Sequence, residues 1–274
     1  AANASAPRGS WQDQRPADWT AYHPPPRARH SAVVWTNRTA PSGGATYVLL
    51  FGGRGNSLGC RSVIETPYGR CTRTGWLRND TMRYNVRART WQPLRSAGRG
   101  PPPLEEHVAV VYNDSMYVYG GWDGVSHYNE DVYQYDIHGD RWLPDVVATT
   151  AADDPLAAPG KRRRAVAVVV SGQGVSRDYM LVYGGFYQHE HAALDFGAGL
   201  AYEQRRPYVF VDHVAMLEFG TRHWLRVEVS PHTPAPRLLH ATGFVLYDRD
   251  ASRHVLYVHG GLEADEHVDA VDDG

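Results

Sequence analysis

The chain has 274 residues, of which 42% are hydrophobic and 21% are charged, and its formal net charge is -2. This length supports a large core, while 28 basic against 30 acidic residues argue against a nucleic-acid or membrane-surface protein, which would carry a basic excess. Apolar runs such as residues 165–170 are too short to cross a bilayer. Because the first residue is Ala1 and no signal-type segment precedes it, we expect a processed chain or an excised piece.

Four pairs of adjacent glycines each follow a short apolar run. The pairs are Gly52-Gly53, Gly120-Gly121, Gly184-Gly185 and Gly260-Gly261. The runs before them are residues 47–51, 116–119, 180–183 and 255–259. A second run precedes each of these, at residues 30–35, 107–112, 164–170 and 240–247. Such β-branched, aromatic and aliphatic runs predict buried strands, because they are too short for helices.

Three of the four units continue with another strand and a tryptophan. The strands are expected at residues 80–84, 131–135 and 212–217, and the tryptophans are Trp91, Trp142 and Trp224. Tyr84, Tyr135 and Leu217 each stand seven positions before a tryptophan, with turn-forming residues between, which predicts a hairpin. The chain therefore contains three four-strand units and the first two strands of a fourth.

A repeated four-strand unit is typical of a β-propeller blade. The chain resembles the kelch-repeat family in its Gly-Gly pairs, in the Tyr-x6-Trp spacing of two units, and in a Pro-x-Arg-x-x-His type of opening at residues 25–30 and 234–240. The resemblance covers about residues 24–262 and implies an all-β, kelch-type β-propeller with three full four-stranded blades plus half of a fourth, in an incomplete ring. A WD-repeat propeller is the competing interpretation, but its dipeptide occurs once, at Trp122-Asp123.

The expected blades are residues 27–103, 104–160, 161–236 and the partial unit 237–274, and residues 1–26 are expected to end in the fourth strand of a preceding blade. Leu217, Arg164 and the pair Glu105-Glu106 depart from the repeat pattern. An open half-ring exposes blade edges, so we expect the isolated chain to be marginally stable or prone to aggregate. The resemblance implies a structural core made of Gly52, Gly53, Tyr84, Trp91, Gly120, Gly121, Tyr135, Trp142, Gly184, Gly185, Trp224, Gly260 and Gly261.

Three connections are unusually long, at residues 54–79, 144–161 and 186–208. Connections after the second and fourth strands of a blade leave from one face of the propeller, so all three are expected there. Long loops on a rigid scaffold are often functional, although neutral insertion is the alternative. Arg and Tyr are enriched in interface hot spots. The candidate contacts for a protein or glycan partner are Arg54, Arg61, Tyr68, Arg70, Phe186, Tyr187 and His189.

The first of these connections holds the only two cysteines, Cys60 and Cys71. Their spacing suits a loop-closing disulfide, and two reduced thiols in a cytosolic protein are the alternative. Glycosylation sequons begin at Asn3, Asn37, Asn79 and Asn113, of which Asn79 and Asn113 also suit turn chemistry. Together these features favour an extracellular protein or ectodomain, similar to attractin-like kelch modules, over a cytoplasmic one.

The third connection carries His189, His191 and Asp195, which could bind a metal ion. A metal-dependent or carbohydrate-active kelch enzyme that uses residues 186–208 is therefore the alternative function. A solvated polar loop explains the same residues, so we expect neither a cofactor nor catalysis. The basic run at residues 161–164 occupies a blade opening and does not indicate nucleic-acid binding. The favoured function is a protein-binding or scaffold module.

Overall fold

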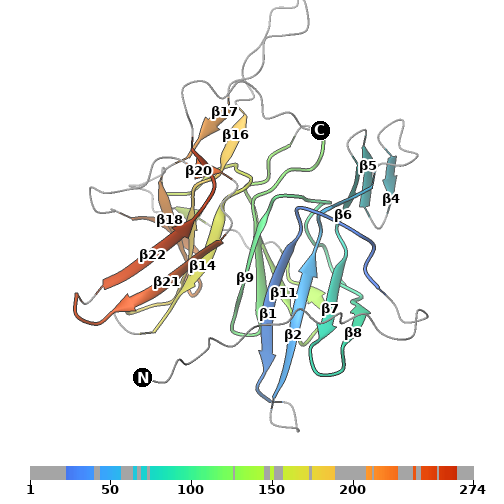
Figure 1. Cartoon of the computed structure of the whole chain (residues 1–274), viewed down its shortest axis with the longest axis horizontal. Helices are drawn as coiled ribbons and strands as arrows, with labels where there is room; N and C mark the ends of the chain where they lie inside the picture. Colours follow the sequence, from blue (N-terminus) through green and yellow to red (C-terminus); the bar gives the residue numbers. More distant parts are fainter. Residues whose placement is uncertain are drawn as a thin grey trace, which may run out of the picture.

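A computed structural model shows the chain as a series of antiparallel β-sheets, which follow one another across the molecule in sequence order (Figure 1). The structure describes residues 23–39, 44–56, 64–66, 69–72, 75–125, 127–144, 149–150, 157–172, 175–188, 208–211, 213–227, 237–238, 242–251 and 253–263. Within these ranges there is no helix long and apolar enough to span a membrane.

Two complete four-stranded sheets come first. The first sheet has the order β1 (Ser31–Asn37), β2 (Ala45–Phe51), β7 (Thr81–Asn85) and β8 (Thr90–Pro93). The second sheet runs from β9 (Val108–Tyr112) through β10 (Ser115–Tyr119) and β11 (Val132–Asp136) to β12 (Arg141–Trp142). In both sheets the four strands of a unit pair in sequence order, as the repeats predict, and β2 and β7 are joined by the first long connection.

The third sheet consists of β14 (Val166–Val170), β15 (Tyr179–Tyr183), β18 (Val214–Glu218) and β19 (His223–Arg226), with the short strand β13 (Thr149–Thr150) added beside β19. The fourth sheet contains β21 (Thr242–Asp248) and β22 (Arg253–His259). Three four-strand units and half of a fourth are thus confirmed, with strand ends within a few residues of those expected.

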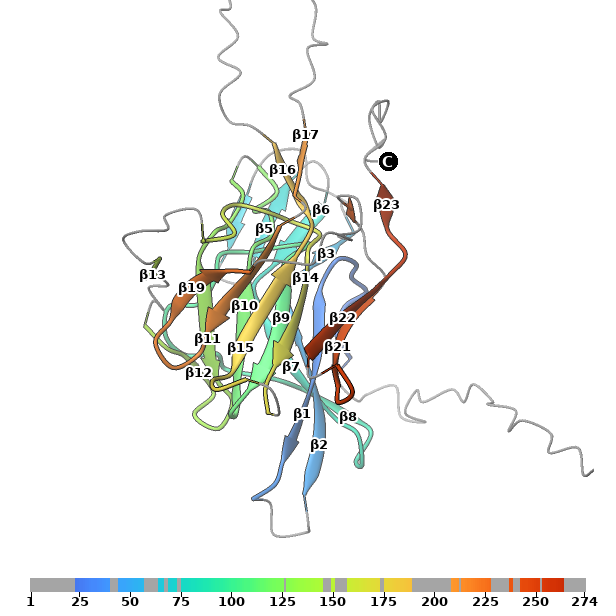
Figure 2. The same ribbon diagram turned by 90° about the vertical axis from the view of Figure 1, so that its left-hand side faces the viewer.

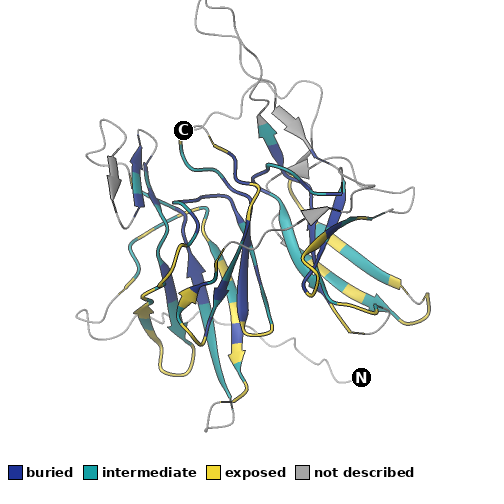
Figure 3. Cartoon of the chain, turned by 180° about the vertical axis from the view of Figure 1, so that it is seen from behind, coloured by how far each residue is buried: buried dark blue, intermediate teal, exposed yellow. Residues whose placement is uncertain are grey.

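The core lies between neighbouring sheets. Leu49 and Phe51 of the first sheet pack with Met116 and Val118 of the second. The second and third sheets share another cluster, and the third packs on β21 and β22 through Val245, Leu256 and Val258. Buried residues therefore concentrate where sheets face each other (Figure 3). The second and third sheets each pack on two neighbours, and their strands are accordingly apolar on both faces.

The predicted aromatic core residues differ in their burial. Trp142, Trp224 and Tyr135 are buried, at 4%, 2% and 0% exposure, whereas Tyr84 and Trp91 are half-buried and pack on each other with ring centroids 5.1 Å apart. In the part of the chain that the structure describes, β8 is the edge of its sheet. The prediction that Tyr84 and Trp91 are core residues is therefore only partly correct.

The segment that leads into the second sheet and the segment that leads into the third sheet each run beside the last strand of the sheet that they enter. Ala97, which precedes the second sheet, forms a parallel bridge with Arg141 of β12. In the third sheet, β13 pairs in parallel with β19. Gly100 lies against the ring of Trp142, where an added Cβ would come within 2.5 Å of Cδ1. The incoming chain thus covers the outer edge of these sheets.

The long connections form small sheets of their own. The first contributes β3 (Arg54–Gly55), β6 (Gly75–Arg78), β5 (Gly69–Thr72) and β4 (Ile64–Thr66), in that order. The third begins and ends in the pair β16 (Phe186–Gln188) and β17 (Tyr208–Phe210), and β20 (Arg237–Leu238) pairs with β23 (Leu262–Glu263). We call the end of the molecule that carries β3–β6, β16 and β17 the upper face (Figure 2).

The second long connection is described only in part. Its strand β13 lies at the outer edge of the third sheet, beside β19 (Figure 2), and Ala157 is buried in the core between the second and third sheets. These parts of the connection are held by backbone pairing and apolar burial, and its place on the same face as the other two stays a prediction.

Candidate arginine–glutamate site on the upper face

The same backbone contact recurs where each Gly-Gly pair ends a strand. The residue after the pair forms a bridge with the segment that opens a sheet, in the pairs Ala28–Arg54, Glu105–Trp122 and Arg163–Phe186. Gly53 has a φ of +88°, and an added Cβ would lie 2.7 Å from the carbonyl oxygen of Ala28. Glycine is required here because the turn and the approach both exclude a side chain.

A second repeated feature joins one sheet to the next. Arg29, Glu106 and Arg164 occupy equivalent positions with φ values of 59°, 57° and 58°. The Glu106 amide donates a hydrogen bond to the Arg29 carbonyl oxygen, and the Arg164 amide donates to that of Glu106, both at 2.9 Å. This left-handed conformation is uncommon for residues other than glycine. Three side chains from three sheets are thereby brought together at the upper face.

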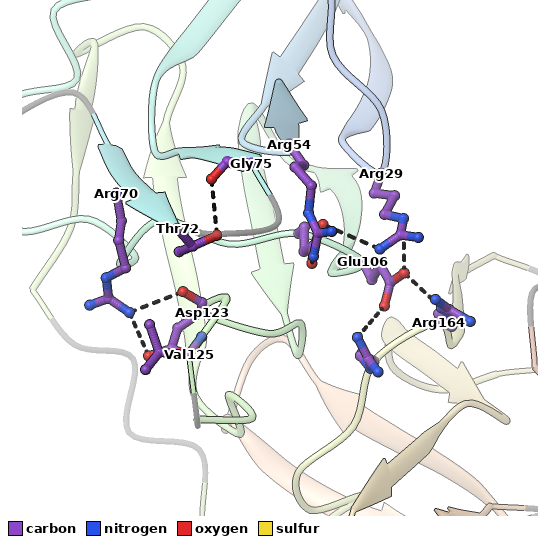
Figure 4. Close-up of polar contacts among 11 residues, drawn as sticks. Arg29, Arg54, Arg70, Thr72, Gly75, Glu106, Asp123, Val125 and Arg164 are labelled. Carbon is purple, nitrogen blue, oxygen red and sulfur yellow. Dashed lines mark hydrogen bonds and ion pairs between the residues drawn. The ribbon is translucent and has the colours of Figure 1, made fainter. Parts of the chain in front are cut away.

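These residues form a compact charged site, the arginine–glutamate cluster, which consists of Arg29, Arg54, Glu105, Glu106, Arg163 and Arg164. The Glu106 carboxylate is 2.7 Å from Arg164 Nε, 3.3 Å from Arg29 Nε and 3.1 Å from Arg163 Nη1. Figure 4 shows Arg29 and Arg164 on either side of Glu106.

Glu105 completes the cluster. Its carboxylate forms an ion pair with Arg54, and Arg29 Nη1 lies 3.7 Å from Glu105 Oε2. Burial raises the pKa of the Glu105 carboxyl, and the adjacent Arg54 guanidinium opposes that rise.

Burial divides the cluster into an inner and an outer part. The side chains of Glu105 and Glu106 are 0% and 3% exposed, whereas those of Arg54 and Arg29 are 14% and 31% exposed. Among the described residues, four guanidinium groups surround two carboxylates, so these six side chains carry a formal excess of two positive charges. The outer arginines place part of that excess within reach of solvent.

Aromatic rings hold Arg163 in place. Its guanidinium carbon lies 5.0 Å from the ring centroid of Trp122, 5.5 Å from Tyr128 and 4.7 Å from Phe186. Cations are attracted to the faces of aromatic rings at such distances. Arg163 is therefore fixed both by Glu106 and by three rings, which makes it a rigid part of the site.

The β3–β6 sheet is anchored beside the cluster. Arg70 Nη1 of β5 lies 2.6 Å from Asp123 Oδ2 and donates a 3.0 Å hydrogen bond to the Asp123 carbonyl oxygen (Figure 4). Asp123 Oδ1 in turn accepts from the amides of Val125 and His127. The insertion of the first sheet is thus bound to the loop that follows β10 in the second.

The predicted contact residues differ in their ion pairing and exposure. Arg54 and Arg70 lie on the upper face but form internal ion pairs. Phe186 is only 3% exposed, so it supports Arg163 and is not available as a surface contact. Tyr187 is half-buried. The other three predicted contacts, Arg61, Tyr68 and His189, lie outside the described residues.

The metal and cysteine predictions fall largely on parts that are not described. His189, His191 and Asp195 lie outside the described residues, and within them no group of three or more His, Cys, Asp or Glu side chains could hold a metal ion. Cys71 is buried in β5 and is not a free thiol. Because Cys60 lies outside the described residues, its pairing with Cys71 stays a prediction.

Comparison with known proteins identifies the repeat. The KLHDC2/KLHL20/DRC7 Kelch-repeats domain family model matches residues 8–261. The chain belongs to the kelch-repeat family. A leucine-zipper-like transcriptional regulator 1 homolog of Drosophila melanogaster is 28% identical over 127 residues, which are 46% of this chain and 11% of that protein.

Other matches cover a shorter stretch or have lower identity. Host cell factor 1 of Rattus norvegicus is 28% identical over 99 residues, covering 36% of this chain and 4% of that protein. The kelch chain therefore spans about a tenth or less of the curated relatives it matches. A solved structure titled "Structure of YjhT" aligns with a TM-score of 0.48 and 15% identity, over 82% of this chain and 57% of that one.

The kelch openings also explain two buried arginines. Arg27 forms a two-pronged pair with Asp80, at 2.6 and 2.9 Å, and donates to the Gly52 carbonyl oxygen at 3.0 Å. Arg162 donates to the Gly184 carbonyl oxygen at 3.2 Å. Each arginine thus binds a carbonyl oxygen of the Gly-Gly turn in its own blade.

The arginine–glutamate cluster itself was not predicted as a site. Glu105-Glu106 looked like a departure from the repeat, and the basic run at residues 161–164 looked like an ordinary opening. The available signal was the alignment of the three openings, which places Arg29, Glu106 and Arg164 at one position.

Proposed function

We propose that this kelch domain is a protein-interaction module that binds an acidic segment of a partner protein on its upper face. Kelch family membership supports the general role. The observation that carries the specific proposal is the positive excess of the arginine–glutamate cluster, with Arg29 and Arg54 partly open to solvent.

The arrangement suits recognition more than catalysis. Arg163 is fixed by rings and by Glu106, and the Arg29 and Glu106 backbones are hydrogen-bonded across blades. A preorganised site loses little conformational entropy on binding. Guanidinium groups bind carboxylates in well-defined geometry, so Asp or Glu side chains of a partner are the matching chemistry.

Fluorescence anisotropy with a labelled acidic peptide tests the proposal, with a peptide of equal length whose Asp and Glu are replaced by Asn and Gln as comparison. We expect the acidic peptide to bind more tightly, and its affinity to fall as salt rises. R29A should weaken that binding by roughly tenfold, the loss of one charge-assisted contact. R253A is the matched control, because Arg253 is 68% exposed on β22 and remote in sequence from the cluster.

Equal affinities for the two peptides, or the same affinity for R29A and the unchanged chain, would contradict an acidic partner on this face. Circular dichroism of R29A verifies that any loss of binding does not come from unfolding.

A further inference from the structure

Three glycosylation sequons lie within the described residues, and they differ in the surroundings of the hydroxyl residue at their third position. In the sequon of Asn37, Thr39 is exposed. Its Oγ1 donates a 2.8 Å hydrogen bond to Asn37 Oδ1, and its backbone amide donates to the same oxygen at 3.0 Å. The carboxamide of Asn37, which is half-buried, is therefore held through its oxygen, and neither of these two hydrogen bonds engages Nδ2.

Asn37 also lies at a projecting end of the blade. The β1–β2 pairing extends to Asn37 opposite Ala45, whereas β7 pairs with β2 only as far as Tyr47 opposite Asn85. The end of the hairpin therefore extends past the neighbouring strand, at the end of the molecule opposite the upper face (Figure 2). A bulky group attached here would lie at the end of the molecule opposite the arginine–glutamate cluster (Figure 2).

In the sequon of Asn113, the fold buries the hydroxyl residue. Its hydroxyl residue, Ser115, is buried in β10, and Ser115 Oγ accepts a 3.0 Å hydrogen bond from Gln134. Asn113 itself lies in a tight turn with a φ of +43°, and the carboxylate of Asp114 accepts from Trp35 of the preceding blade at 2.7 Å. Asn113 itself is exposed, so it is the burial and hydrogen bonding of the Ser115 hydroxyl that set this sequon apart from that of Asn37.

In the sequon of Asn79, the hydroxyl residue is buried and the middle residue forms an ion pair. Thr81 is 1% exposed in β7, Asn79 is half-buried, and the residue between them, Asp80, is bound to Arg27. Asn37 is half-buried as well, so the sequon of Asn79 is distinguished by its buried Thr81 and by the adjacent ion pair.

We propose that Asn37 is the N-glycosylated residue among these three sequons, and that Asn79 and Asn113 stay unmodified in the folded protein. In the transfer, Asn37 Nδ2 attacks the anomeric carbon of an oligosaccharide carried on a lipid pyrophosphate. The new N–C bond replaces the bond from that carbon to the pyrophosphate oxygen, Nδ2 gives up one proton, and the lipid pyrophosphate leaves. The reaction places the domain in a secretory compartment.

This proposal is independent of the acidic partner. It is tested with the whole chain expressed behind a cleavable secretion leader in eukaryotic cells, in an N3Q background so that three sequons remain. Total cell material and medium are digested with peptide N-glycosidase in ¹⁸O water, and the Asn-to-Asp conversion of each sequon peptide is measured by mass spectrometry.

We expect conversion at Asn37 to exceed that at Asn79 and Asn113 by at least tenfold. N37Q and T39A should each abolish the glycosidase-sensitive mobility shift, whereas T39S retains it and N79Q and N113Q leave it unchanged. T39A keeps the asparagine, so agreement between T39A and N37Q excludes an unrelated effect of either substitution. An unmodified Asn37 peptide, or comparable conversion at Asn79 or Asn113, overturns the proposal.

Discussion

The indole N–H of Trp35 donates a 2.7 Å hydrogen bond to Asp114 Oδ1, which links the first blade to the β9–β10 turn of the second. Trp35 is 3% exposed, so its polar atom depends on this partner. We expect W35F to lower the free energy of unfolding by about 1–2 kcal/mol, because a hydrogen bond to a charged group and some packing are lost. Urea denaturation measures the change.

D114N is the control for this contact, since the amide oxygen of an asparagine retains the acceptor. A W35F chain as stable as the parent would show that the bond contributes nothing to joining the blades.

We expect the Glu106 carboxylate to stabilise the arginine–glutamate cluster. Its carboxylate is 3% exposed and contacts Arg29, Arg163 and Arg164. E106Q removes the negative charge that faces the buried guanidinium groups of Arg163 and Arg164, and breaking a buried pair costs about 3–5 kcal/mol. E130Q, at an exposed position, should change stability little. Similar unfolding midpoints for E106Q and E130Q would contradict this account.

Two glycines with the same φ make it possible to distinguish the cost of backbone strain from the cost of a steric clash. Gly53 and Gly172 both have a φ of +88°, but an added Cβ meets the Ala28 carbonyl oxygen at 2.7 Å in Gly53 and nothing within 4 Å in Gly172. G172A should cost about 1–2 kcal/mol, the left-handed strain alone. G53A should cost more, and thermal unfolding of the two variants measures the difference. Equal losses would refute a steric role for Gly53.

His107 gives the stability a pH dependence. Burial, followed by the charge of nearby His30, lowers the pKa of His107 to about 3, and its Nε2 lies 2.9 Å from Ser31 Oγ. An unfolded imidazole takes up its proton near pH 6.5. The unfolded chain therefore binds more protons between about pH 3 and 6.5, and stability falls as the pH drops through this range.

H107Q tests this assignment. It removes the contribution of His107, so the free energy of unfolding should depend less steeply on pH. His30, whose pKa burial also lowers, adds a smaller effect in the same direction. An unchanged slope in H107Q would exclude His107 as a source.

The fourth sheet presents an apolar surface. Phe244, Leu246 and Tyr257 are 47%, 56% and 47% exposed, and the rings of Phe244 and Tyr257 stack with centroids 5.0 Å apart. We expect L246K to reduce concentration-dependent association, measured by light scattering, because exposed apolar patches promote it. V245K is not a fair control, since Val245 packs on the third sheet; R253K serves instead. Equal association of L246K and R253K would show that the surface responsible for association lies elsewhere.

The strands and their repetition were predictable from the sequence, because Gly-Gly pairs, apolar runs and Tyr-x6-Trp spacing are local signals. The β3–β6 sheet was not, since Gly69–Thr72 and Gly75–Arg78 contain no long apolar run. The cluster around Glu106 escaped prediction for another reason. Its members come from three blades, and their meeting depends on inter-blade hydrogen bonds that no local pattern encodes.

The segments that pair beside β12 and β19, Ala97 and β13, belong in sequence to the unit before each of those strands. A chain that starts at residue 104 retains every strand of the second blade yet lacks Ala97, whose carbonyl oxygen accepts a 2.7 Å hydrogen bond from the Trp142 amide. A chain that starts at residue 161 likewise lacks β13. Cuts made at the boundaries of the sequence repeat therefore leave an unpaired outer edge, whereas cuts placed just after the fourth strand of the preceding blade keep each sheet with its own cover.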